Sequence, residues 1–300
     1  MDAAQQAKAG ALIHWRVTRL IVNADDFGMT SGINRAIVEL HEAGVLTSAT
    51  LMARATATDE AIKAAKATPS LGVGCHVVLV DGEPISRDLT TLAREGAFQA
   101  TLGAFVKKLL AGAIRSDEME QEARAQIQLL QLRGVHLTHV DAHKHTHMFP
   151  QVLRPVLRAA RACGIRAVRN PFEPEWSVAA TPGAPFVRRM EVRMLRMLAG
   201  RFHRIVADEG FTTTDGAVGV LATGTLDAGT IASLLRAMPA NGTYELVTHP
   251  GYNDADLARV RTRLRASREM EREALLTMAN AAKVKLISFA GLQGAAAAIS

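Results

Sequence analysis

The chain has 300 residues, of which 48% are hydrophobic and 21% are charged, a mixture that is ordinary for a globular protein and argues against disorder. Lys and Arg exceed Asp and Glu by 35 to 29, so the net charge of +6 is compatible with an anionic partner. Aromatic residues make up only 4%, which disfavours a protein that stacks the bases of single-stranded nucleic acid.

Apolar runs alternate with amphipathic stretches along the chain. Strands are expected at 20–24, 48–52, 71–80, 137–140, 165–168, 217–221, 244–247 and 284–289. Helices are expected at 33–43, 59–67, 102–132, 151–163, 228–238 and 254–281. This alternation predicts an α/β fold with parallel strands, and the number of strands favours a (β/α) barrel of seven or eight strands over an open sheet.

We expect one barrel domain over residues 19–300, preceded by an N-terminal tail at 1–18. A proline-containing loop is expected at 171–185, and a basic helix at 186–204 that carries six arginines between Phe, Val, Met and Leu residues. This region, about 171–206, is predicted to be an insertion. Its helix either packs on the barrel with solvated arginines or lies at an anionic membrane surface.

The two cysteines, Cys75 and Cys163, are too few for a disulfide framework and indicate a reducing compartment. Residues 1–10 are polar, and no run of about 18 apolar residues occurs. We therefore expect a cytoplasmic protein, which the basic helix would allow to contact the inner face of the membrane. The oligomeric state is left open, with a homodimer as one option.

Two adjacent carboxylates, Asp25 and Asp26, directly follow the first predicted strand. Side by side they would repel each other, unless one binds a metal ion and the other accepts a proton. A turn that caps the following helix is an equally good interpretation of this pair alone.

A histidine-rich segment follows the fourth predicted strand. It contains His139, Asp141, His143, His145 and His147, all at positions of one parity. If the strand continued, its period of two would direct these side chains to one face, where imidazoles are common ligands of divalent metals. The alternative is an incidental cluster of surface histidines.

Three further residues are candidates for the same site. His76 lies within the third strand and is either a core residue or a ligand, whereas Arg169 and His249 follow the fifth and a later strand. The carboxyl ends of the strands form one face of a parallel barrel, where active sites lie. One Asp and two His would leave an open position on the metal, which is typical of hydrolytic sites.

These motifs resemble the YdjC-like carbohydrate deacetylase family, which includes chitooligosaccharide deacetylases. The resemblance rests on the segments IVNADDFG, TSATLMA, GVGCHVVL, THVDAHKHTHMFP and VTHPGY. The basic insertion and the passage RNPFEPEW are most similar to the hopanoid-biosynthesis-associated deacetylase of this family. The resemblance implies a (β/α) barrel that removes an N-acetyl group from an amino sugar.

The resemblance also implies roles for individual residues. It assigns the metal ligands as Asp26, His76 and His143, the catalytic base as Asp25, the catalytic acid as His249, and orienting groups as Asp141 and Arg169. One divalent ion is expected; the mixed nitrogen and oxygen ligands favour Zn²⁺, and the family leaves Mg²⁺ as an alternative. The expected substrate bears N-acetylglucosamine and is an N-acetylglucosaminyl hopanoid lipid, or else a chitooligosaccharide.

Other functions remain open from the sequence. A metal phosphoesterase would need a second metal ion, for which His145 and His147 are available. A non-catalytic carbohydrate- or lipid-binding protein would hold a structural metal with four protein ligands. Nucleic-acid binding is supported only by the arginine-rich helix, and we do not expect it.

Overall fold

A computed structural model describes residues 18–280 and 284–296, so the predicted tail lies outside the described residues except for Thr18. The main sheet is parallel and follows the order β6-β3-β2-β1-β8-β7, with β9 beside β1. Its strands are β1 (Arg19–Phe27), β2 (Ser48–Leu51), β3 (Gly72–Val77), β6 (Leu137–Ala142), β7 (Gly216–Val218), β8 (Thr243–Thr248) and β9 (Lys285–Leu286).

Residues 165–168, the expected fifth strand, bridge the two ends of this sheet through isolated contacts at Ala167 and Val168. The N–H of Val140 donates to Ala167 O at 3.0 Å, and the N–H of Val168 donates to Thr212 O at 3.0 Å. Thr212 lies just before β7, so the segment joins β6 to the strand at the opposite end. The α/β class and the parallel, barrel-like sheet are thus confirmed.

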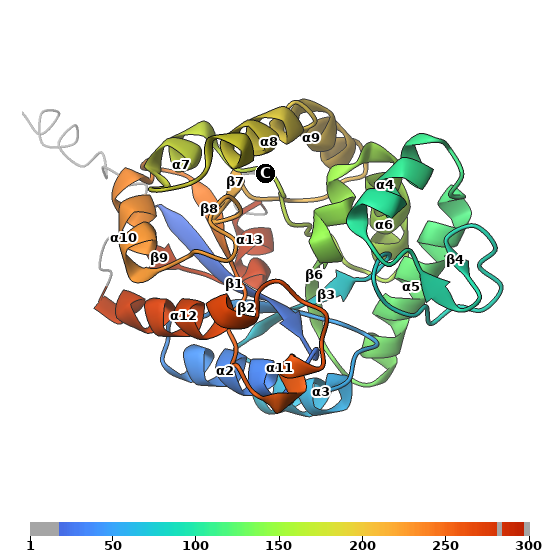
Figure 1. Cartoon of the computed structure of the whole chain (residues 1–300), viewed down its shortest axis with the longest axis horizontal. Coiled ribbons are helices and arrows are strands. Elements are labelled where there is room, and N and C mark those ends of the chain that lie inside the picture. The colour runs from blue at the N-terminus through green and yellow to red at the C-terminus, as the bar shows by residue number, and fades with distance from the viewer. Residues whose placement is uncertain (1–17, 281–283, 297–300) are drawn as a thin grey trace, which may run out of the picture.

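Helices surround the strands on the outside (Figure 1). They are α2 (Ser31–Glu42), α3 (Thr58–Ala67), α4 (Leu102–Leu110), α5 (Ser116–Leu132), α6 (Pro150–Ala162), α7 (Glu175–Ala180), α8 (Phe186–Arg196), α9 (Ala199–Asp208), α10 (Ala228–Ala237), α11 (Ala255–Ala258), α12 (Arg265–Leu276) and α13 (Phe289–Ala296), with 3₁₀ segments η1 (His143–Met148) and η2 (Thr277–Asn280). Strands β2, β3, β6 and β8 are buried along their whole length, as expected for parallel strands covered on both faces.

Three helix predictions were wrong because each predicted helix is interrupted. The helix expected at 102–132 divides into α4 and α5, with Gly112 in the left-handed region at φ +67° between them. The helix expected at 254–281 divides into α11, α12 and η2, and its last residue lies outside the described residues. The helix expected at 186–204 divides into α8 and α9, and α9 buries Phe202, Ile205 and Val206.

Two strand and loop predictions also need correction. The proline-containing loop at 171–185 includes the short helix α7. Of the strand expected at 284–289, only β9 pairs with β1, and Phe289 begins α13. Phe289 is fully buried, and its ring stacks on the His139 ring with centroids 3.8 Å apart, so packing turns the chain into a helix there.

The connection after β3 is held against α5 by side chains one helical turn apart. Glu118 accepts backbone N–H groups of residues 90–92, Glu122 accepts those of 85 and 86, and Gln126 accepts that of 78. The connection carries the hairpin β4 (Ala93–Arg94) and β5 (Ala97–Phe98) and lines a cavity of about 650 Å³ with Arg54. This cavity includes none of the site residues predicted above.

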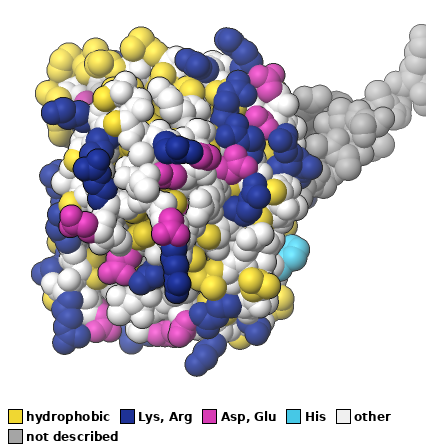
Figure 2. All heavy atoms as spheres, turned by 90° about the vertical axis from the view of Figure 1, so that its right-hand side faces the viewer, with side chains coloured by type: hydrophobic (Ala, Val, Ile, Leu, Met, Phe, Trp, Pro, Cys, Tyr) yellow, Lys and Arg dark blue, Asp and Glu magenta, His cyan; other side chains and the backbone are white. Residues whose placement is uncertain are grey.

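Most of the exposed large hydrophobic side chains among the described residues lie on α8 and the residue after it. Six of the nine exposed large hydrophobic side chains among the described residues belong to this stretch: Phe186, Val187, Met190, Met194, Leu195 and Met197. Figure 2 shows apolar side chains gathered at the top of the molecule, the height at which Figure 1 places α8. None of the described helices combines the length and hydropathy that crossing a membrane requires.

Candidate metal centre and active site

The two adjacent carboxylates reach one site because β1 is irregular at its carboxyl end. Neighbouring residues of a regular strand point to opposite faces. Here the pairing with β2 shifts register between Ala24 and Phe27, and Asp26 has a left-handed backbone with φ 65°. Both side chains are buried and lie near His76.

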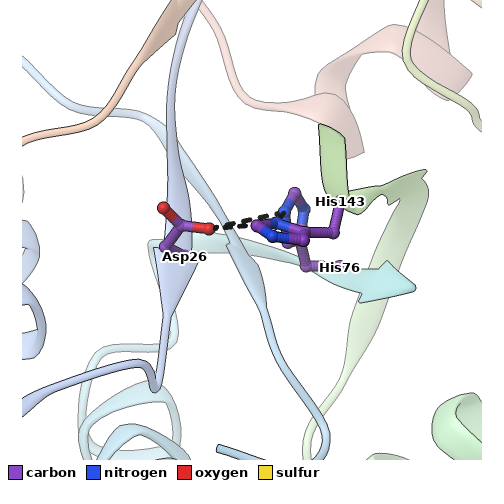
Figure 3. A group of neighbouring side chains, drawn as sticks. All are labelled: Asp26, His76 and His143. Carbon is purple, nitrogen blue, oxygen red and sulfur yellow. Dashed lines mark hydrogen bonds and ion pairs between the residues drawn. The ribbon is translucent and has the colours of Figure 1, made fainter. Parts of the chain in front are cut away.

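Asp26, His76 and His143 bring three ligand atoms together (Figure 3). Asp26 Oδ1 is 3.6 Å from His76 Nε2 and 3.4 Å from His143 Nδ1, and the two nitrogens are 3.2 Å apart. Ligand atoms held 2.0–2.1 Å from a tetrahedral zinc ion are about 3.4 Å from one another. The spacing of these three atoms therefore fits one ion of this kind, with a fourth position left for water or substrate.

Asp141 fixes the orientation of the His76 ring. Its Oδ1 lies 2.8 Å from His76 Nδ1, and Thr50 Oγ1 lies 3.1 Å from the same nitrogen, so Nε2 faces the other ligand atoms. Burial disfavours the His76 imidazolium, but the carboxylates of Asp141, Asp25 and Asp26 raise its pKa to about 9. A bound cation would take the place of that proton, because a histidine ligand must be neutral at the ligating nitrogen.

Arg169 organises three buried carboxylates. Its guanidinium donates to Asp25 at 2.6 and 2.8 Å, to Asp141 at 2.5 Å and to Glu245 at 2.8 Å. Its Nη2 also forms an ion pair with Glu245 Oε1 at 2.6 Å. Burial opposes the charge of Asp25, but Arg169 and His76 hold the pKa of this carboxyl well below its usual range. Burial raises the pKa of Glu245 to about 7 against the effect of Arg169.

His249, the residue directly after β8, reaches the same centre. Its Nε2 is 3.7 Å from Asp25 Oδ2, and its side chain is 11% exposed. Its backbone N–H donates to Glu271 at 2.6 Å, and its ring Nδ1 is 3.9 Å from the same carboxylate oxygen. The ring therefore stands between two carboxylates at the edge of the site.

The other histidines of the histidine-rich segment do not lie where the period of a strand would place them. β6 ends at Ala142, and Lys144 and His145 both have left-handed backbones, so the alternation does not continue. His139 packs in the core, and His147 lies 3.3 Å from the carbonyl of Arg169. Among the described residues, neither His145 nor His147 belongs to a group whose ligand atoms converge, so a second metal ion finds no support there.

Buried polar residues of the site that were not predicted from the sequence include Asn23, which donates to Asp25 Oδ1 at 3.0 Å, and Thr50, Glu245, Arg268 and Glu271. The one with a sequence signal is Glu245, an acidic residue within an apolar strand. Arg268 and Glu271 lie in a helix with many charges, so nothing in the pattern distinguishes them from solvated residues. Arg268 donates to Asp26 Oδ2 at 2.5 Å and, against the effect of burial, lowers the pKa of this carboxyl well below its usual range.

The crystal structure of a protein from Enterococcus faecalis has a TM-score of 0.73 to this chain, with 24% identity, and covers 92% of this chain and 99% of that one. The lactam utilization protein from Thermus thermophilus has a TM-score of 0.53 and 15% identity, with 90% and 99% covered. Both likenesses concern the fold alone.

Closer relatives are found by sequence. A carbohydrate deacetylase of Brevibacillus brevis is 41% identical over 155 residues, which are 51% of this chain and 60% of that protein. A chitooligosaccharide deacetylase of Salmonella typhimurium is 40% identical over 148 residues, 49% of this chain and 57% of that protein. The matched part thus spans about three-fifths of these relatives. The family model described as YdjC-like protein matches residues 19–285, and the chain therefore belongs to the YdjC-like family.

Proposed function

We propose that this protein is a metal-dependent hydrolase that removes the N-acetyl group from a substrate bearing N-acetylglucosamine. The spacing of Asp26, His76 and His143 carries the proposal, because it suits one ion with an open position. Two proteins similar to this chain are named deacetylases, which supports an amide as the bond that is hydrolysed. Zn²⁺ suits these ligands best, and Mg²⁺ is the alternative ion.

Asp25 and His249 are the proton carriers in this proposal. The bound ion would polarise the acetyl carbonyl and lower the pKa of a water molecule. Asp25 accepts a proton from the attacking water, whose oxygen bonds to the carbonyl carbon. His249 then donates its proton to the nitrogen as the carbon–nitrogen bond breaks, giving acetate and a free amine. Arg169 keeps Asp25 ionised and correctly oriented, and Asp141 orients the His76 ligand.

The finer proposal is that the amino sugar is attached to a lipid, with an N-acetylglucosaminyl hopanoid as the candidate. The apolar side chains of α8 support it, because single-chain soluble proteins rarely expose such a cluster without a partner. α8 belongs to the connection between residue 170 and β7, and such connections after barrel strands lie on the face of the active site. The exposed Arg188, Arg201 and Arg204 nearby suit anionic head groups.

The reaction is tested with the metal-loaded chain, an N-acetylglucosaminyl lipid and soluble chitooligosaccharides, followed by mass spectrometry. The expected result is loss of one acetyl group per sugar, with metal bound at about one ion per chain. A phosphoesterase would instead bind about two ions and release phosphate from esters. Absence of acetate release from every N-acetylated substrate would refute the deacetylase proposal.

The membrane contact is tested separately by sedimentation with anionic vesicles. Met194→Ser combined with Met197→Ser should weaken binding, whereas Leu110→Ser combined with Leu132→Ser, at exposed apolar positions elsewhere, should not. Arg189 is unsuitable for this test, because its guanidinium donates to the carbonyls of residues 178, 181 and 184 and so holds the chain around α7. Equal binding by both double variants would refute the contact.

A further inference from the structure

Helix α12 carries two charged side chains that are completely buried, Arg268 and Glu271. They are three residues apart and therefore lie on one face of the helix. A buried charge is costly unless it is paired, so such residues need specific partners. Both find their partners among the residues to which the proposed reaction assigns roles.

Arg268 holds the outer oxygen of the ligand Asp26. Its Nη2 donates to Asp26 Oδ2 at 2.5 Å, while Asp26 Oδ1 faces His76 and His143. The two oxygens of Asp26 therefore have different partners: Oδ2 is bound by α12, and Oδ1 would be free to bind the ion. Groups that hold a metal ligand from behind commonly fix its orientation and affect metal affinity.

Glu271 holds His249 from the side opposite Asp25. Its Oε2 accepts the backbone N–H of His249 at 2.6 Å and lies 3.9 Å from ring Nδ1, whereas ring Nε2 faces Asp25 at 3.7 Å. The same connection also rests on Arg268, because the N–H of Gly251 donates to the Arg268 carbonyl at 3.2 Å. A Cβ at Gly251 would lie 3.2 Å from Arg268 Cδ, so glycine permits this close approach.

We propose that α12 positions both halves of the active site: Arg268 orients the metal ligand Asp26, and Glu271 orients the proton donor His249. The inference rests on the proposed function, since it takes these roles from it. The His249 ring is thus held between Asp25 of β1, which faces Nε2, and Glu271 of α12, which faces Nδ1 and binds the backbone N–H.

The test compares Arg268→Met and Glu271→Gln in the full chain, with Arg268→Lys as the conservative variant. Arg265→Met and Glu273→Gln are matched controls, because both residues are exposed on the same helix. Zinc affinity is measured by competition with a chromophoric chelator, and the contact of Glu271 with His249 by hydrogen exchange of the His249 backbone amide. Neither measurement requires turnover, so loss of the proposed deacetylase activity alone would leave this inference intact.

The expected results differ for the two residues. Arg268→Met should weaken zinc binding about 10- to 100-fold, and Arg268→Lys should recover part of it. Glu271→Gln should keep zinc affinity within about threefold, speed exchange of the His249 amide at least about threefold because a charged acceptor is lost, and lower kcat more than it changes KM. Unchanged zinc affinity in Arg268→Met, or unchanged exchange of the His249 amide in Glu271→Gln, would overturn the corresponding half of the proposal. If Arg268→Met does not fold, Arg268→Lys takes its place in the test. A zinc affinity of Arg268→Lys equal to that of the wild type would then contradict the role of Arg268 in orienting Asp26.

Discussion

Arg169 holds both carboxylate oxygens of Asp25: its Nη2 is 2.6 Å from Oδ1 and its Nη1 is 2.8 Å from Oδ2. This two-point contact fixes the plane of the carboxylate and keeps it ionised at neutral pH. The same guanidinium also binds Asp141, which contacts His76, and Glu245 of β8. The proposed base and these two residues therefore share one cation. The positions of these residues therefore depend on one another through Arg169.

Removal of any one metal ligand should abolish tight metal binding. Asp26→Ala, His76→Ala and His143→Ala each leave two of three protein ligands, and each is expected to lose most bound metal and activity. Elemental analysis after gel filtration measures the bound metal. A variant with stoichiometric metal and normal turnover would show that its residue is not a ligand.

Asp25→Asn should show whether Asp25 acts as the catalytic base or as a metal ligand. The amide cannot accept a proton as the carboxylate does, so turnover should fall roughly 10²–10⁴-fold while the metal content stays at the wild-type level. Single-turnover acetate release and metal analysis on the same sample check both parts. Loss of metal in this variant would mean that the roles of Asp25 and Asp26 are exchanged.

Arg169→Gln should destabilise the protein by about 3–5 kcal/mol, because it leaves Asp25, Asp141 and Glu245 buried without their shared cation. Without Arg169, burial raises the pKa of the Asp25 and Glu245 carboxyls, so the folded state binds more protons than the unfolded state. The loss of stability should therefore grow from pH 5 to pH 8. Urea unfolding at both pH values measures it.

The matched control for this variant is Arg154→Gln, which removes an exposed arginine with partners at 3.6 and 3.9 Å. It should change the free energy of unfolding by less than about 1 kcal/mol at either pH. Equal effects of the two substitutions would contradict the central role of Arg169.

Metal affinity should rise with pH because His76 must lose a proton to bind the ion. The pKa of His76 is raised to about 9 in the metal-free protein, so below that pH the proton competes with the metal. The affinity is expected to increase about tenfold per pH unit between pH 7 and pH 9. Calorimetric titration in buffers of different ionisation enthalpy also counts the proton released. An affinity that does not change with pH would contradict this prediction.

Glu118→Gln should loosen the connection that follows the ligand strand β3. The carboxylate of Glu118 accepts N–H groups of Thr90, Thr91 and Leu92, and the substitution should cost about 2–3 kcal/mol of stability. Burial opposes the Glu118 charge, but these donors lower its pKa to about 2. Its contribution is complete above pH 4.5 and is lost as the pH falls toward 2.

Comparison of the unfolding free energies of wild type and Glu118→Gln at pH 7 and pH 3 checks this sign. The difference between the two proteins should be larger at pH 7. Hydrogen exchange of the amides of residues 90–92 gives a local readout, and unchanged protection there would show that the contacts do not stabilise the connection.

The sequence by itself determined the strands and the residues at their ends. Apolar runs gave β1, β2, β3, β6 and β8 within a few residues, because strands buried on both faces must be apolar throughout. Asp25, His143, Arg169 and His249 were placed together for a general reason: the carboxyl ends of parallel strands share one face. Local pattern and topology sufficed for these predictions.

Only the tertiary structure decided which side chains meet and in what geometry. Period-two alternation puts Asp25 and Asp26 on opposite faces, and the left-handed backbone of Asp26 overrides it. The same kind of departure at Lys144 and His145 ends the alternation that would have aligned His145 and His147 with His143. Arg268 contacts Asp26, about 240 residues away in the sequence, and Glu271 contacts His249, about 20 residues away. Both contacts depend on the packing of α12. Contacts between segments so far apart depend on the folded arrangement, and no local pattern of residues encodes them.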